Sequence, residues 1–217
     1  MRRRAVITTV IALLAVIASF GQTALAAPVD DAIVDLQHDW EVIRYRSPVA
    51  ERDKQFEALA AKAHRVTEIH AGRPEPLIWE GIILSSWAAE RGGLAALGLV
   101  KQAKTLYEAA IAIDGSALDG SAYGSLGALY YKVPGWPIGF GDKAKAKELL
   151  QRALTLNPRG IDANFFYGEY LFEAKQKDQA IDYLTRALAA PARPGRQLAD
   201  DGRREEARAL LERARGK

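Results

Sequence analysis

The sequence predicts an all-α protein whose helical hairpins stack into a solenoid, and three observations support this prediction. The 217-residue chain contains 39 Ala and 24 Leu, which favour helices, and only 8% of its residues are aromatic. Turn-forming pairs such as Asp114-Gly115 and Asn157-Pro158 separate the helical runs. An apolar pattern in the second half of the chain repeats with an offset of 34 residues.

Residues 1–26 have the three features of a secretory signal peptide. The positive stretch Arg2–Arg4 is followed by the apolar run Ala5–Phe20 and then by the small residues of Ala24-Leu25-Ala26. This run is shorter than the roughly 20 apolar residues that span a bilayer. We therefore expect cleavage before Ala27 and a periplasmic protein without a membrane span. The chain has no Cys, so we expect no lipid anchor.

The charge balance argues against nucleic acid or an anionic membrane as a partner. The whole chain has a net charge of +3, but three of its 30 basic residues and none of its 27 acidic residues lie in residues 1–26. The mature chain is therefore expected to have a net charge of zero. Nucleic-acid-binding proteins carry an excess of positive charge, which this chain lacks after cleavage.

The weakest helical pair comes first along the chain. Residues 30–46 and 50–69 are predicted helices separated by Ser47-Pro48, and we interpret them as a divergent first repeat. The next unit has its first helix at residues 77–90. About ten residues, including Arg91-Gly92-Gly93, are inserted before its second helix relative to the last unit.

Two later units carry the clearest repeat. Small and bulky apolar residues recur with the spacing 4, 3, 5, and each position of one unit returns 34 residues later. Upstream of each set, a glycine is followed three positions later by a bulky residue. Because Gly is disfavoured inside a helix, we expect Gly127 and Gly168 at tight helix–helix contacts. The two sets are Ala146, Leu150, Ala153, Pro158 and Ala180, Leu184, Ala187, Ala192.

These residues resemble the tetratricopeptide repeat, whose pattern is W-x2-L-G-x2-Y, then A-x3-F, then Pro. The unit at 120–158 matches through Tyr123, Leu126-Gly127 and Tyr130, and the next unit has Asn164 at the usual aromatic position. The resemblance implies a tetratricopeptide-type helical-hairpin solenoid whose first helices line a concave groove. It also implies a scaffold that binds a partner.

The last element is a predicted capping helix. Residues 196–215 are highly charged and form an amphipathic pattern, and a polar terminal helix is the usual cap of a solenoid. No linker-like stretch divides residues 27–217, so we expect a single repeat domain. The apolar side of the capping helix carries Leu198, Ala207, Leu210 and Leu211.

The chain carries no recognisable catalytic or metal-binding motif. His64 and His70 are six residues apart, which places them on nearly opposite faces of a helix. P-loop, dinucleotide-binding, nucleophile-elbow and zinc-protease motifs are absent from the sequence. We therefore expect no cofactor, no metal and no enzyme activity. The alternative is a carboxylate enzyme that pairs Glu169 with Asp162 or Glu173 on the groove.

The segment 130–142 is about seven residues too long for the turn between two helices of one repeat. It is rich in Gly and Pro and contains Trp136 and Phe140. One interpretation is a compact loop whose aromatic side chains fold back onto the helix ends. The other is a loop at the rim of the groove, beside Tyr131, whose aromatic side chains contact a partner.

Candidate groove residues follow from the tetratricopeptide resemblance. They occupy the positions that the family uses on the face of the first helices turned away from the second helices. Phe165, Glu169 and Phe172 form one helical stripe, in which we expect the Phe side chains to pack against the C-terminal helix. The full set is Ile78, Ile82, Ser85, Tyr131, Lys132, Asp162, Phe165, Glu169, Phe172 and Glu173.

A narrower resemblance covers most of residues 75–213. The stretches GIILSSWAAERGGLAALGLVKQAK, LDGSAYGSLGALYYKVPGWPIGFGD and GIDANFFYGEYLFE are similar to secreted bacterial proteins related to the T component of TRAP transporters. Members of that group often carry a lipid anchor, for which this chain lacks the Cys. The resemblance implies a partner protein such as a periplasmic solute-binding protein. A small apolar ligand is the alternative partner, and the oligomeric state is left open.

Overall fold

The structure is a computed structural model that describes residues 28–216. The predicted signal peptide lies outside these residues. Every regular element in the described range is an α-helix, and none of these helices is long and apolar enough to cross a membrane. The helices are α1 Val29–Tyr45, α2 Val49–Ile69, α3 Pro74–Arg91, α4 Gly93–Asp114, α5 Ala117–Lys132, α6 Lys143–Leu156, α7 Ile161–Glu173, α8 Lys177–Leu188 and α9 Gln197–Ala214.

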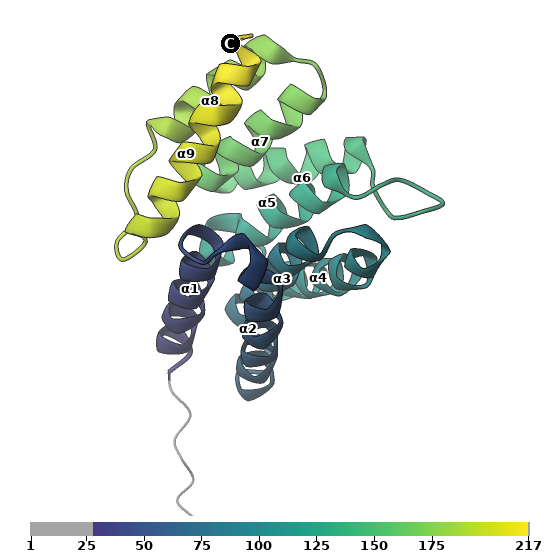
Figure 1. The fold of residues 1–217 in the computed structure, drawn as a ribbon, viewed down its shortest axis with the longest axis vertical. Coiled ribbons are helices and arrows are strands. Elements are labelled where there is room, and N and C mark those ends of the chain that lie inside the picture. The colour runs from purple at the N-terminus through teal and green to yellow at the C-terminus, as the bar shows by residue number, and fades with distance from the viewer. Residues whose placement is uncertain (1–27, 217) are drawn as a thin grey trace, which may run out of the picture.

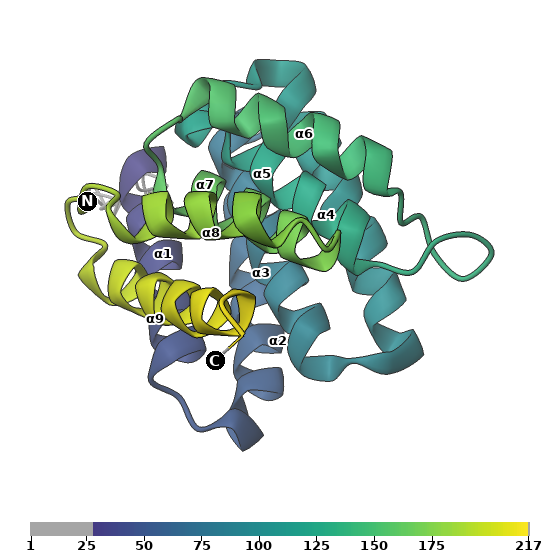
Figure 2. The same cartoon turned by 90° about the horizontal axis from the view of Figure 1, so that it is seen from above.

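The helices form four consecutive hairpins followed by one further helix (Figure 1). The hairpins are α1–α2, α3–α4, α5–α6 and α7–α8, and α9 packs on α7 and α8 as the predicted cap. Figure 2 shows α8 and α9 side by side. This arrangement confirms the predicted all-α, tetratricopeptide-type solenoid with a C-terminal capping helix.

Close approach within the hairpins depends on glycines at equivalent positions. A Cβ atom on Gly127 would lie 2.8 Å from Leu150 Cγ, and one on Gly168 would lie 3.0 Å from Leu184 Cγ. Gly81 in α3 faces the ring of Tyr107 in the same way. These contacts confirm the predicted register of Gly127 and Gly168, because each glycine meets a bulky residue of the second helix.

The residues predicted as an insertion in the second hairpin do not form a loop. They lengthen its helices, so α3 and α4 have 18 and 22 residues, against 13 and 12 in α7 and α8. A sharp turn at Gly92 and Gly93 joins the two long helices, with φ values of 65° and 59°. Glycine adopts this left-handed region without steric cost, so the hairpin needs no longer connection.

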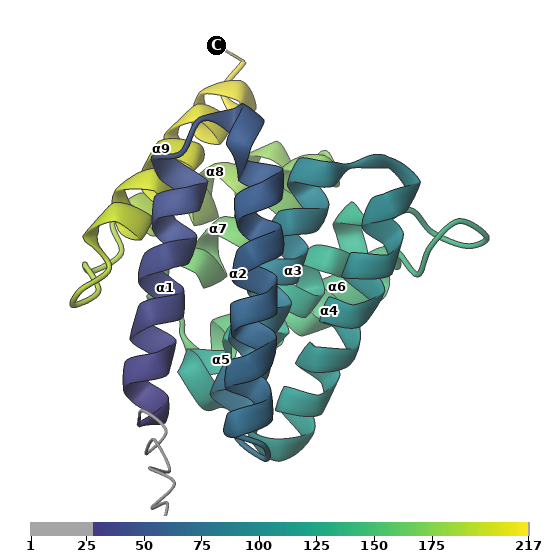
Figure 3. The same cartoon turned by 60° about the horizontal axis from the view of Figure 1, so that its bottom comes forward.

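The odd-numbered helices form an inner layer that closes on itself. α1 contacts α3, α3 contacts α5, α5 contacts α7, α7 contacts α9, and α9 contacts α1. Each even-numbered helix packs on the odd-numbered helices before and after it, outside this ring. Figure 3 shows α9 beside the C-terminal half of α1. The concave surface expected of a solenoid is therefore enclosed by the first and last helices.

Charged side chains join α1 to the C-terminal part of the chain. Arg44 donates to Glu206 at 2.9 Å, and Arg196 donates to Glu41 at 3.4 Å. Arg44 also reaches Glu90 of α3 at 3.4 Å. We call the contact between α1 and α9, with these ion pairs, the α1–α9 seam.

Candidate functional site

A cleft of about 390 Å³ lies inside the ring of odd-numbered helices. All five helices of the ring contribute to its walls, together with the turn before α7 and the segment 191–196. Its volume is in the range of small-molecule sites, which are typically about 300–1,000 Å³. The apolar part of the wall includes Trp40, Trp79, Ile82, Leu118, Ile161 and Phe166.

Two tryptophans from different hairpins meet on this wall. The Trp40 and Trp79 rings pack edge to face with centroids 6.0 Å apart, and Trp40 donates its indole N–H to Ser86 Oγ at 2.8 Å. Trp79 is only 5% exposed, yet its indole N–H has no acceptor among the described residues. A buried donor without an acceptor is costly, which makes Trp79 unusual in this core.

Arginines from the C-terminal segment converge on one carboxylate of the cleft. Arg193 Nη1 and Arg203 Nε each donate to Asp162 at 2.7 Å. Burial alone would raise the pKa of Asp162, but the two guanidinium groups outweigh it and hold the pKa at about 2. Arg193 also donates to the fully buried carboxylate of Asp200 at 2.7 Å.

The same arginines cover aromatic rings. Arg203 lies 4.6 Å from the centroid of Phe165 and 4.9 Å from that of Phe166. Arg196 lies 5.1 Å from the centroid of Trp79. Burial lowers the pKa of Arg196, and the neighbouring charge of Arg193 lowers it further. The C-terminal segment therefore brings positive charge onto the apolar wall.

A left-handed turn forms another part of the wall. Leu118, Asp119 and Gly120 have φ values of 48°, 57° and 77°, so the regular part of α5 begins only after them. Ser121 Oγ donates to the Leu118 carbonyl at 2.7 Å and helps to hold the turn. Two consecutive non-glycine residues in this region are costly, which marks the turn as strained. Asp119-Gly120 is a turn-type dipeptide, and this signal could have predicted the break.

The predicted groove residues of α3 and the start of α7 do not all reach the cleft. Ile82 and Asp162 line it. Ile78, by contrast, is fully buried in the core and is not available to a ligand. Ser85 Oγ forms a hydrogen bond with the hydroxyl of buried Tyr107 at 3.1 Å. The face assigned to α3 was thus partly wrong, because Ser85 lies one turn after Gly81 and, like it, faces Tyr107 of α4 within the same hairpin.

Phe165 and Phe172 are packed, as we expected for the Phe side chains of the stripe. Phe165 is buried among residues of α8 and α9, and Phe172 packs against the same cluster. Arg213 of α9 lies 5.2 Å from the Phe172 centroid. Neither Phe lines the cleft.

A second group of predicted residues gathers between α5 and α7, away from the cleft lining. Tyr131 Oη donates to Glu169 at 2.5 Å and Lys132 Nζ donates to the same carboxylate at 2.8 Å. Burial raises the pKa of Tyr131, and the charge of Glu169 raises it further. Burial likewise raises the pKa of Glu173, with Glu169 as the second cause. These contacts tie α5 to α7.

Asp162 and Glu169 do not act as a pair. Asp162 is held by two arginines at the cleft, whereas Glu169 is held by Tyr131 and Lys132. The geometry therefore does not support the pairing of Glu169 with Asp162 in the carboxylate-enzyme alternative. Within residues 28–216, no group of three or more His, Asp or Glu side chains is arranged to hold a metal ion.

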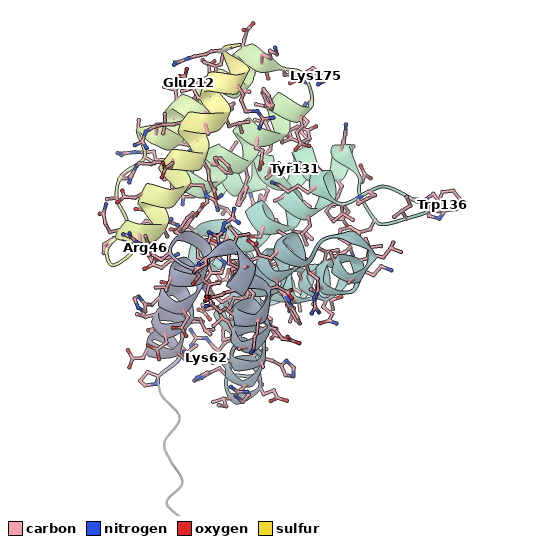
Figure 4. All side chains as sticks on the ribbon, in the orientation of Figure 1. Arg46, Lys62, Tyr131, Trp136, Lys175 and Glu212 are labelled. Carbon is pink, nitrogen blue, oxygen red and sulfur yellow. The ribbon has the colours of Figure 1, made fainter. Side chains whose placement is uncertain are left out.

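The loop between α5 and α6 has a packed base and an exposed tip. At its base, the Asp142 N–H donates to the Tyr130 carbonyl at 2.8 Å, and Phe140 packs edge to face on the Tyr130 ring with centroids 5.4 Å apart. At its tip, Trp136 is 91% exposed and projects away from the body (Figure 4). Phe140 thus packs against the body of the protein, whereas Trp136 is exposed to solvent.

The position of this loop differs from our expectation. No residue of 133–141 lines the cleft. The loop lies instead near α4, where Lys104 Nζ is 5.9 Å from the centroid of the Phe140 ring. Tyr131 points instead to Glu169 on α7. We expected the loop to lie beside Tyr131, and this was wrong. Consecutive helix residues face in different directions, so Tyr130 contacts the loop and Tyr131 does not.

Comparison with known proteins finds structural similarity at low sequence identity. No protein-family profile and no curated protein matches the chain. The MamA protein is similar in structure at 19% identity and a TM-score of 0.44, over 86% of this chain and 90% of its own. TTC0263, a thermophilic TPR protein in Thermus thermophilus, is similar at 13% identity and a TM-score of 0.43. The similarity covers 84% of this chain and 100% of TTC0263. The assignment of the architecture therefore rests on the hairpins and their glycine contacts.

Proposed function

We propose that this protein is a helical-repeat scaffold that binds a partner protein through the loop 133–141. The observation that carries this proposal is Trp136, 91% exposed at the tip of a loop whose base is held by hydrogen bonds. Ile138 beside it is 58% exposed. A Trp on a preorganised loop loses little conformational entropy on binding, and Trp is the residue type most enriched among interface hot spots.

We also propose that the protein is exported and that its partner is a periplasmic protein. Support comes from the signal-peptide pattern of residues 1–26 and from the resemblance to proteins related to the T component of TRAP transporters. A periplasmic solute-binding protein is the partner that this resemblance favours. N-terminal sequencing of the exported protein should begin at Ala27, and a sequence that begins at Met1 would contradict export by cleavage.

Affinity capture followed by quantitative binding tests the loop. The exported protein is immobilised, proteins captured from periplasmic extract are identified by mass spectrometry, and the main captured protein is purified for titration. Trp136→Ala should weaken its Kd by at least about 30-fold, which corresponds to roughly 2 kcal/mol. Leu94→Ala is the matched control, because Leu94 is an 81% exposed apolar side chain at the start of α4. Equal Kd values for wild type and Trp136→Ala would rule out the loop as the binding site.

Phe140→Ala separates stability from binding within the same loop. Loss of the contact with Tyr130 should lower the free energy of unfolding by about 1 kcal/mol, the usual worth of an aromatic pair beyond its area. Urea denaturation measures this change. Trp136→Ala should leave the denaturation midpoint unchanged, and a drop comparable to that of Phe140→Ala would show that Trp136 is packed in solution.

A further inference from the structure

The start of α7 presents backbone donors at the central cleft. Gly160, Ile161, Asp162 and Ala163 all line the cleft. The N-cap residue Gly160 has no side chain to accept a hydrogen bond, and the N–H groups of Ile161, Asp162 and Ala163 have no acceptor among the described residues. The first turn of a helix carries a partial positive charge, and such donors are a common site for anions.

Two side chains add buried hydroxyl and N–H groups to the same cleft. The Trp79 indole N–H is buried and has no acceptor in the described part of the chain, and the Tyr45 hydroxyl is also buried without a partner there. The Tyr45 ring packs directly against Gly202 of α9, so closely that a Cβ atom at Gly202 would overlap the ring. Both side chains line the cleft, so a small side-chain shift on binding would bring either donor to an acceptor that enters it.

The charged residues of the cleft lining favour an anion over a cation. Arg193 and Arg203 are neutralised by Asp162 and its neighbours, as described above. Arg196 reaches Glu41 only at 3.4 Å, and Arg159 makes no ion pair with any described residue. The lining contains four arginines and two carboxylates: Arg159, Arg193, Arg196, Arg203, Asp119 and Asp162.

Asn164 fixes the turn that carries Arg159. Its side-chain amide donates to the carbonyls of Pro158 at 3.0 Å and Gly160 at 2.8 Å. The unusual Asn at this repeat position therefore shapes the turn at the cleft through two hydrogen bonds from one short side chain. This gives the departure from the repeat pattern a local physical role.

We propose that the central cleft binds a small organic acid. Its carboxylate or sulfonate accepts hydrogen bonds from donors of the lining, and its flat apolar body packs on the wall formed by Trp40, Trp79 and Phe166. The cleft volume of about 390 Å³ suits a ligand of one or two rings. This site is separate from loop 133–141 and does not depend on the proposed partner.

A pair of fluorescent probes that differ only in charge tests this site. 1-Anilinonaphthalene-8-sulfonate carries a sulfonate on the same aromatic body as neutral N-phenyl-1-naphthylamine. Each is titrated into the full protein, and the fluorescence increase gives the Kd and the stoichiometry. Because charge-assisted hydrogen bonds are stronger than neutral ones, the sulfonate should bind at one site and at least about tenfold more tightly. Equal affinity of the two probes, or saturation at several sites, would overturn the proposal.

Two variants locate the anion at the cleft. Arg159→Gln should weaken the sulfonate about three- to tenfold and leave the neutral probe unchanged, and Trp79→Phe, which also removes part of the apolar wall, should weaken the sulfonate more than the neutral probe. Arg65→Gln is the matched control, because Arg65 is an exposed arginine on α2 outside the cleft lining. Arg159 is exposed, so its replacement should not affect folding, which circular dichroism checks. An unchanged sulfonate Kd in Arg159→Gln and Trp79→Phe would place the anion elsewhere and overturn the proposal.

Discussion

The hairpin interiors and the α1–α9 seam hold the molecule together by different chemistry. Inside the hairpins, a glycine of one helix meets a Leu of the next, as Gly127 meets Leu150 and Gly168 meets Leu184. At the seam, ion pairs such as Arg44 with Glu206, which lie 162 positions apart in the sequence, accompany the packing of the Tyr45 ring on Gly202. Repeated apolar contacts build the hairpins, and non-repeated charges close them into a ring.

This difference predicts how each region responds to substitution. An apolar interface loses stability in proportion to the packing that is disturbed. In a buried charge network, removal of a single side chain can cost much more stability, because it leaves its charged partners buried without compensation. The seam should therefore be the more fragile region.

Arg203→Met should have the largest effect. Arg203 pairs with Glu206, which is the seam partner of Arg44, and with Asp162, and its side chain is only 12% exposed. Met retains apolar contact with Phe165 but removes one of the two arginines that each carboxylate contacts, so we expect a loss of about 3 kcal/mol, the low end of the range for a broken buried ion pair. Urea denaturation followed by circular dichroism measures it. Arg208→Met on the exposed side of α9 is the control and should change stability by less than about 0.5 kcal/mol.

Gly127→Leu should have a smaller effect, confined to the hairpin interior. The new side chain would overlap Leu150, and overpacking of this kind costs about 1–3 kcal/mol. Gly98→Leu is the matched control, because no atom lies within 4 Å of a Cβ at Gly98. If both variants kept the wild-type denaturation midpoint, the assigned register of the α5–α6 hairpin would be wrong.

Acidification should give the smallest effect and act on the arginine cluster. The folded pKa of Asp162, about 2, is below its usual value of 3.8, so its charge stabilises the fold above about pH 4. This contribution is lost as the pH falls toward 2. Because the side chain is 36% exposed, solvent screening limits it to about 1 kcal/mol. The stability difference between wild type and Asp162→Asn should narrow by this amount between pH 5 and pH 2. A constant difference would show that Asp162 has an ordinary pKa.

Much of the candidate site depended on residues that carry no local signal. The loop 133–141 could be predicted, because excess length, Gly and Pro are visible in the sequence, whereas the sequence left open whether Trp136 is packed or exposed. Phe140 and Tyr131 could not be placed, because their neighbours depend on the direction in which each helix residue points. Arg193, Arg196 and Arg203 were not predicted as site residues, since charged residues in a C-terminal helix usually face solvent.

The sequence by itself determined the hairpins, the capping helix and the glycine contacts. These features depend on helical periodicity and on interactions between neighbouring elements, and both produce patterns that are visible over short stretches of sequence. Only the tertiary structure decided that α9 returns to α1, that Ile78 is buried while Ile82 lines a cleft, and that Trp79 shares this cleft with α7. The curvature of a solenoid accumulates from small rotations between repeats, so ring closure is a property of the whole chain.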